Sequence, residues 1–284
     1  MPDPIVALIA AAERTAAEAD RLSARFAKEL AAILRRTERA LAPVVSELDA
    51  QSPTSILRLA ATAQLQQRFR AVLREAGYDV LADVATDTPL DAIEARVLAS
   101  RAVAQLGAAL RVEGQQQLAA LKSLHYADLL DAGDTMGREL AGVVARGSLA
   151  SISRRSLRED LGDIIDRADS RIRTIYDTAV SLYGRQVEAI HAGDDPETVF
   201  AYMGPVDDQT RKFCLDHVGR VYTRSDIDEL DNGQLDNTFL TGGGYNCRHI
   251  WMEVSAFSEL QDLEGTSQRV PEIMDAVREV RAAA

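Results

Sequence analysis

The sequence has little of what marks disulfide-rich, membrane-spanning or disordered proteins. Its 284 residues include two cysteines, too few for a disulfide framework. No stretch approaches about eighteen uncharged apolar residues, so we expect no membrane-spanning helix and no membrane partner. The amino-terminal segment lacks the basic start of a signal peptide, which predicts a soluble protein made in a cytoplasm. Hydrophobic residues make up 46% and charged residues 27%, a globular balance that excludes wholesale disorder.

Positive charge is also scarce. The sequence has thirty-two lysines and arginines and forty-four acidic residues, which gives a net charge of −12 and a pI near 4.9. Such a surface repels phosphate backbones on average, so broad electrostatic binding of DNA is not expected. Only a local basic patch could bind nucleic acid.

Residues 1–192 predict an elongated body of long amphipathic helices. Within residues 4–48 the apolar positions recur every three or four residues, which lays one stripe along a helix. Pro43 is expected to bend or interrupt this helix, because proline removes a donor and clashes with the preceding turn. Ser52-Pro53 and Thr88-Pro89 have the pattern of helix starts and predict two further helices.

Residues 156–190 predict a long helix that pairs with another helix. Its apolar residues alternate steps of three and four, as in a coiled-coil seam: Leu161, Ile165, Ala168, Ile172, Ile175, Ala179 and Leu182. Arginines also gather here, among them Arg154, Arg155, Arg158, Arg167 and Arg171. Two interpretations stay open for them. They form a solvated face paired with nearby carboxylates, or they form a contact surface for an acidic partner or DNA.

The composition changes in residues 193–254. This segment holds seven of the seventeen glycines, both cysteines, the only tryptophan and seven of the fourteen aromatic residues. The pattern predicts a small α+β module, with strands at 199–203, 221–223 and 247–254, a short helix at 210–218 and a loop at 231–244. A last helix is expected within residues 255–284. The fold class is therefore mainly α, with this module at the carboxyl-terminal end.

The cysteines and histidines of the module suggest a metal site. Cys214 and His217 share a helix face at spacing i, i+3, and Cys247 and His249 share a strand face at spacing i, i+2. Together they make a tetrahedral Cys2His2 set, which zinc favours and which leaves no open position for catalysis. Other interpretations stay open: ordinary core residues without metal, a Cys214–Cys247 disulfide, or a cysteine–histidine nucleophilic pair.

Two segments of the module resemble a known family. They are GPVDDQTRKFCLDHVGRVY at residues 204–222 and YNCRH at residues 245–249. They are similar to the phage Mu F-like minor head proteins, the phage head morphogenesis family. The matching positions are Asp208, Thr210, Arg211, Cys214, His217, Gly219, Asn246, Cys247 and Arg248. Gly244 stands where the family has a histidine, and His249 where it has its last cysteine.

The resemblance covers roughly residues 150–254 and implies a minor structural protein of a tailed-phage or phage-like head. Such a protein associates with the portal and capsid proteins, helps assembly or DNA delivery, and is found in the virion after assembly in a bacterial cytoplasm. It is not an enzyme. The arginine-rich helix would then be the surface that touches packaged DNA. The alternatives are a zinc-containing enzyme, either a nuclease or a cysteine hydrolase, and a cytosolic helical adaptor.

Overall fold

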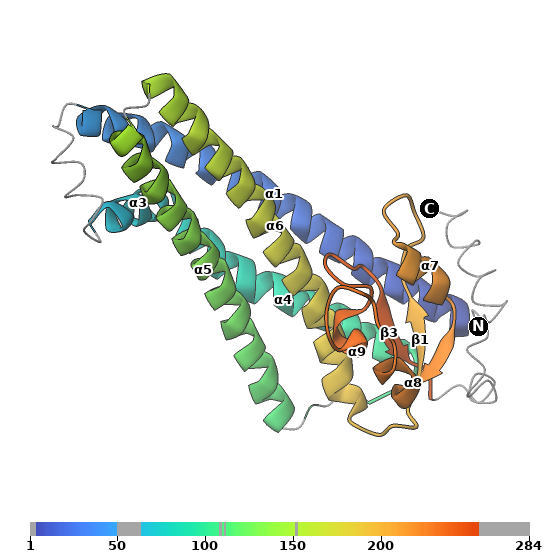
Figure 1. The fold of residues 1–284 in the computed structure, drawn as a ribbon. Helices are drawn as coiled ribbons and strands as arrows, with labels where there is room; N and C mark the ends of the chain where they lie inside the picture. Colours follow the sequence, from blue (N-terminus) through green and yellow to red (C-terminus); the bar gives the residue numbers. More distant parts are fainter. Residues whose placement is uncertain (1–3, 50–63, 108–109, 111, 151–152, 256–284) are drawn as a thin grey trace. The chain divides into compact units, whose positions relative to one another are not determined.

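The computed structural model describes residues 4–49, 64–107, 110, 112–150 and 153–255 (Figure 1). Helices dominate up to residue 192, and a small sheet with short helices follows. The long helices are α1 (Pro4–Asp49), α3 (Gln64–Glu75), α4 (Tyr78–Val103), α5 (Val112–Ala150) and α6 (Arg154–Ala192). The later elements are β1 (Val199–Met203), α7 (Lys212–His217), β2 (Val221–Thr223), α8 (Arg224–Asp228), α9 (Thr238–Thr241) and β3 (Ile250–Glu253). The predicted fold class, mainly α with a small carboxyl-terminal α+β module, is confirmed.

The helix boundaries predicted at two prolines are wrong. Helix α1 continues through Pro43, and helix α4 contains Pro89, so neither proline interrupts or starts a helix. Proline costs one backbone hydrogen bond in a helix interior, and the buried apolar stripe on each helix offsets that cost. In α4 this stripe includes Leu90 and Ile93, directly after the proline. The predicted helix start at Ser52-Pro53 lies outside the described residues, as does all but the first residue of the predicted 255–284 helix.

The chain forms two compact units. Unit 1 comprises Met1–Leu22, Thr88–Lys122 and Asp177–Ala284, and unit 2 comprises Ser23–Asp87 and Ser123–Tyr176. Residues 193–254 therefore share a unit with parts of four helices. In the part of the chain that the structure describes, no helix is both long and apolar enough to cross a membrane.

Unit 2 is a helical core. Phe26 of α1 stacks on Tyr176 of α6, with ring centroids 3.9 Å apart. Tyr78 is buried and donates a hydrogen bond to the carbonyl of Leu129 at 2.6 Å. Gly133 makes room for that tyrosine, because a Cβ at Gly133 would lie 2.4 Å from the ring.

Helix α6 buries more than a narrow seam. Five of its seven predicted seam residues are buried, whereas Ile175 and Leu182 are only partly so. Tyr176, Tyr183 and Val187 are also buried, although the seam pattern omits them. The buried face is therefore broader than that of a two-stranded coiled coil, and α6 is a core helix.

The arginines of α6 are partly paired. Arg155 contacts Glu159 at 3.0 Å, and Arg171 contacts Glu139 of α5 at 3.0 Å. These two residues fit the interpretation of a solvated, ion-paired face. Arg158 instead lines a groove in unit 2 together with Arg39 of α1.

The three strands form an antiparallel sheet in the order β2-β1-β3. The central strand β1 is buried along its whole length, and it pairs Phe200 with Tyr222 and Tyr202 with Trp251. The short helix α9 packs on this sheet, where its Phe239 meets Phe200 edge to face at 4.9 Å. The result is an aromatic core that includes the two buried cysteines.

Candidate metal centre

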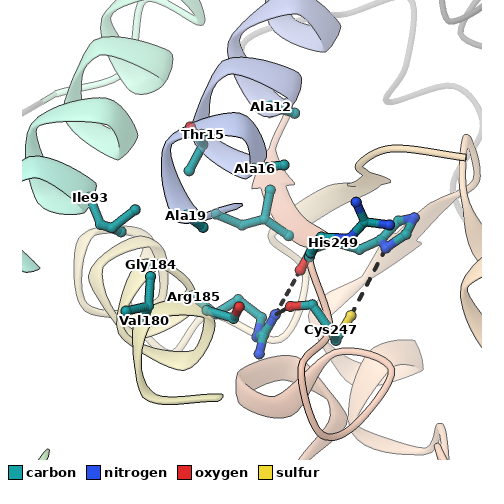
Figure 2. Close-up of a pocket in the computed structure, with 13 residues that line it drawn as sticks. Ala12, Thr15, Ala16, Ala19, Ile93, Val180, Gly184, Arg185, Cys247 and His249 are labelled. Atoms are coloured by element: carbon teal, nitrogen blue, oxygen red, sulfur yellow. Dashed lines mark hydrogen bonds between the residues drawn. The ribbon is translucent and has the colours of Figure 1, made fainter. Parts of the chain in front are cut away.

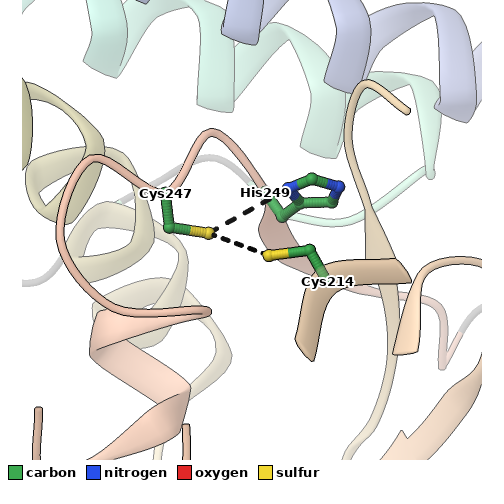
Figure 3. Close-up of side chains that lie close together, drawn as sticks. All are labelled: Cys214, Cys247 and His249. Carbon is green, nitrogen blue, oxygen red and sulfur yellow. Dashed lines mark hydrogen bonds between the residues drawn. The ribbon is translucent and has the colours of Figure 1, made fainter. Parts of the chain in front are cut away.

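Three of the four predicted ligands meet in the structure. Cys214 lies in α7, whereas Cys247 and His249 lie in the segment that leads into β3 (Figure 3). The two Sγ atoms are 3.7 Å apart, and Cys247 Sγ lies 4.0 Å from His249 Nδ1. All three ligand atoms lie within 4.8 Å of one another, and all three residues are buried. Cys214, Cys247 and His249 are therefore close enough to hold a metal ion.

The sulfur–sulfur distance matches an edge of a coordination tetrahedron, whereas the 4.0 Å between Cys247 Sγ and His249 Nδ1 is longer than such an edge. Two sulfurs bound to one zinc ion at about 2.3 Å lie about 3.8 Å apart, close to the observed 3.7 Å. Both cysteines are free thiols, so the disulfide interpretation is not what the structure contains. His249 Nε2 is buried without a hydrogen-bond partner in the described structure. The ring nitrogen that faces Cys247 Sγ is Nδ1, so Nδ1 is the nitrogen that would bind a metal ion.

His217 does not join this group. It is the last residue of α7, which has only six residues, and its ring packs against Phe213 with centroids 4.3 Å apart. Its Nδ1 makes a hydrogen bond of 2.6 Å with the hydroxyl of Tyr222 in β2. Burial lowers the pKa of His217, so it is held neutral in this contact. The i, i+3 spacing was therefore misleading, because Cys214 faces the core and His217 faces the neighbouring strand.

The thiols differ in their environments. Hydrogen bonding from Cys214, assisted by His249 and by the charge of Arg185, holds the pKa of the Cys247 thiol well below its usual value. The same sulfur–sulfur hydrogen bond and burial raise the pKa of Cys214. Without a metal, the pair therefore favours one thiolate, at Cys247, beside one thiol. A thiolate is the form that binds a metal ion.

Glycines at the end of the predicted 231–244 loop pack directly on the sulfurs. The backbone N–H of Gly243 donates a hydrogen bond of 3.1 Å to Cys247 Sγ. A Cβ at Gly243 would lie 2.4 Å from Cys214 Sγ, so no larger residue fits there without movement. Gly204 packs on the His249 ring in the same way, because a Cβ at Gly204 would lie 2.7 Å from that ring. These glycines let the backbone approach the ligands closely.

Arg185 of α6 supports the segment that carries two ligands (Figure 2). Its Nη1 donates hydrogen bonds to the carbonyls of Cys247 and His249, at 3.0 and 2.8 Å, and its Nε donates to Leu240 at 2.5 Å. The side chain is 3% exposed. Three charge-assisted bonds to backbone carbonyls fix the path of this segment. Sequence reasoning missed this residue, although its place on the apolar face of a helix is a signal.

The two segments of the motif are also joined by an ion pair. Arg248, between the two ligands, donates two hydrogen bonds to Asp207, at 2.5 and 2.7 Å. The hydrogen bonds from Arg248 are the main cause that holds the pKa of Asp207 below its usual value, against the opposing effect of burial. Thr210 completes the turn by donating to the Pro205 carbonyl at 3.0 Å. Residues 204–211 and 245–249 are thus held together beside the metal ligands.

A buried ion network connects β3 to the helices of unit 1. Arg101 of α4 contacts Glu188 of α6 at 2.9 Å and Glu253 of β3 at 3.0 Å. Glu188 also accepts a hydrogen bond from the backbone N–H of Glu253 at 3.0 Å. Burial raises the pKa of Glu188 to about 7, against the opposing effect of Arg101. Two acids therefore share one guanidinium, and Glu188 holds its proton up to near neutral pH.

A small cavity of about 20 Å³ borders the centre in unit 1 (Figure 2). It is lined by Ala12 and Ala16 of α1, by Gly184 of α6 and by Cys247 and His249. That volume holds about one water molecule. The cavity therefore offers no room for an organic substrate beside these ligands.

Comparisons with known proteins gave no match. No protein-family model, no curated protein and no solved structure matches this chain. What the arrangement can do chemically follows from its donors: two cysteine sulfurs and one imidazole in a buried pocket, which suit a soft or borderline metal ion.

Proposed function

We propose that this chain is a minor structural protein of a tailed-phage or phage-like head, of the Mu F-like head morphogenesis kind. One observation carries the proposal: the two segments of the resemblance, residues 204–222 and 245–249, form one site. Arg248 pairs with Asp207, and Cys247 lies beside Cys214. The matching positions Cys214 and Cys247 thus contact each other across the two segments, and the matching Arg248 pairs with the residue before the matching Asp208. A chance match in two separate segments would not require these contacts.

The metal in this proposal is zinc, held by Cys214, Cys247 and His249. Thiolate and imidazole donors are the ligands that zinc prefers, and the sulfur–sulfur distance of 3.7 Å fits its tetrahedral geometry. When bound, zinc supplies cross-linking between α7 and the segment before β3. The cavity beside the ligands holds about one water molecule, which favours a structural role over a catalytic one. The protein is therefore proposed to have no enzymatic activity.

The partners in this proposal are portal and capsid proteins, with packaged DNA as a further contact. The DNA contact would involve the arginines of α6: Arg154, Arg155, Arg158, Arg167 and Arg171. Of these, Arg155, Arg158 and Arg167 are exposed. Arg155 and Arg171 would have to exchange their carboxylate partners for phosphates, so we expect DNA contacts to weaken steeply with salt. Ultraviolet crosslinking within intact particles at two salt concentrations measures this contact.

Quantitative mass spectrometry of purified particles tests the proposed function. The particles come from the cells that produce the protein, and they are washed at increasing salt before digestion. We expect a few copies of the chain per particle, retained through washing. A chain that is absent from particles and free in the cytosol would contradict the proposal.

A variant pair tests whether the module is needed for incorporation. Cys247→Ser removes a ligand, and Asp216→Asn changes an exposed residue of α7 that pairs with Lys212 on the surface. We expect the first variant to be lost from particles and the second to be incorporated like the wild type. Equal incorporation of both would show that the module is not what attaches the chain to the particle.

A further inference from the structure

A side-chain oxygen that could be a fourth ligand lies beside the two sulfurs. Tyr202 is in β1, the central strand, and is fully buried. Its hydroxyl oxygen lies 3.4 Å from Cys214 Sγ and 3.4 Å from Cys247 Sγ. Its ring also stacks on His249, with centroids 5.2 Å apart and an interplanar angle of 18°. Tyr202 thus contacts each of the three residues that can hold the metal.

The two equal distances have the length of a coordination edge. Zinc–sulfur bonds of about 2.3 Å and a zinc–oxygen bond of about 2.0 Å place sulfur and oxygen about 3.5 Å apart in a tetrahedron. The observed distances are 3.4 Å to both sulfurs. Three protein ligands alone leave one position open in a tetrahedral site. The hydroxyl of Tyr202 is at the right distance from both sulfurs to occupy it.

We propose that Tyr202 is the fourth ligand of the metal centre, so that the site is Cys2HisTyr and closed to solvent. This deepens the proposed structural metal site and rests on it. On binding, the metal would form bonds with the phenolic oxygen and with both sulfurs, and the Tyr202 hydroxyl proton and the Cys214 thiol proton would leave to solvent. The sheet is then cross-linked directly, because Tyr202 joins β1 to α7 and to the segment before β3.

The glycines around the centre leave little space for a different fourth ligand. A Cβ at Gly242 would lie 3.2 Å from Cys247 Sγ and 3.3 Å from the Tyr202 hydroxyl. A Cβ at Gly243 would lie 2.4 Å from Cys214 Sγ. Backbone therefore covers the sulfurs and the hydroxyl on this side. Among the described cysteines, histidines and acids, Cys214, Cys247 and His249 form the one cluster close enough to hold a metal ion, so a fourth ligand of those types is lacking.

Metal titration of the reduced full-length chain tests the assignment. Zn²⁺ is added while the ultraviolet difference spectrum is recorded, since metal-bound tyrosinate absorbs differently from neutral tyrosine. We expect one tyrosinate signal to grow with the metal and saturate at one equivalent. The same titration with Co²⁺ reports the coordination number through its visible bands, which we expect to be those of a four-coordinate site.

Two tyrosine variants localise the signal. Tyr202→Phe removes the oxygen, and Tyr222→Phe removes a hydroxyl from the same aromatic core that contacts His217 and no ligand. We expect Tyr202→Phe to lose the tyrosinate signal and to bind metal at least about 10-fold more weakly. Tyr222→Phe should keep both. The wild-type titration tests the assignment without any variant, so misfolding of Tyr202→Phe alone would neither support nor contradict it.

The outcomes separate this assignment from the metal site on which it rests. Metal uptake by the wild type without a tyrosinate signal would overturn the role of Tyr202 and leave the three-ligand site standing. Absence of any metal uptake would overturn both. An unchanged signal in Tyr202→Phe would show that another tyrosine produces it, which also overturns the assignment.

Discussion

Alanine at Gly243 is the smallest change that should disrupt the metal centre. The added Cβ would lie 2.4 Å from Cys214 Sγ and 3.4 Å from both Cys247 Sγ and the Phe213 ring. Ordinary contacts begin near about 3.5 Å, so the first contact must open by about 1 Å. Gly243 is not among the residues with positive φ, so the effect is steric and not a loss of backbone freedom.

The expected magnitude follows from that displacement. Overpacking by a methyl group in a tight core costs about 1–3 kcal/mol, which lowers the melting temperature by several degrees in a chain of this size. Metal–ligand distances tolerate about 0.2 Å, so a shift of about 1 Å moves Cys214 out of coordination range. We therefore expect Gly243→Ala to bind metal at least about 10-fold more weakly.

Differential scanning calorimetry and competition with a metal chelator measure both effects. The matched control is Gly162→Ala in α6, where a Cβ would meet nothing within 4 Å. Alanine in a helix is favoured over glycine by about 1 kcal/mol, so this control should be neutral or slightly stabilising and should bind metal normally. If Gly243→Ala keeps the wild-type metal affinity and melting temperature, the inference that this glycine packs closely on the sulfurs is contradicted.

Three further predictions concern the surroundings of the centre. Cys247→Ser should abolish metal binding and unfold the module while circular dichroism still reports the long helices; equal metal content and melting behaviour in mutant and wild type would contradict this. Arg185→Met leaves two buried carbonyls and one partly buried carbonyl without their donor and should cost about 3 kcal/mol in urea unfolding. Arg173→Met removes a partly exposed pair with Asp169 on the same helix and should cost under about 1 kcal/mol. Similar losses in the two variants would remove the special role of Arg185. Glu188 binds its proton more tightly in the folded state, since its pKa rises from 4.5 to about 7 on folding. The free energy of unfolding should therefore fall by up to about 3 kcal/mol as the pH rises through this window. Glu188→Gln should flatten that slope, and parallel pH profiles for the two proteins would refute the shift.

Helical periodicity predicted the body well because burial of one stripe is a local property of the sequence. Strands 199–203 and 221–223 were also predicted correctly, since short apolar runs bounded by glycine and proline have few alternatives. The prolines misled because tertiary burial outweighs a local penalty: Pro89 sits inside α4, next to buried Leu90 and Ile93. Local rules set the elements, and packing decides where they end.

The metal centre was only partly predictable. The spacing of Cys247 and His249 pointed to a shared direction, and Cys214 was the remaining soft donor, so three ligands could be named from sequence. His217 lies outside this cluster because the direction of a side chain at the end of a six-residue helix depends on the neighbouring strand. Tyr202 is separated from the cysteines by 12 and 45 residues, and only the folded sheet brings its hydroxyl to them.

Native mass spectrometry of the reduced full-length chain tests the metal centre most directly. The chain is measured after purification without added metal, after one equivalent of Zn²⁺, and after treatment with a chelator. One bound metal ion per chain is expected in the first two samples, removed by the chelator and missing in Cys214→Ser. A chain that stays metal-free in the presence of zinc, or a Cys214→Ser variant that binds as the wild type does, would contradict a metal centre at Cys214, Cys247 and His249.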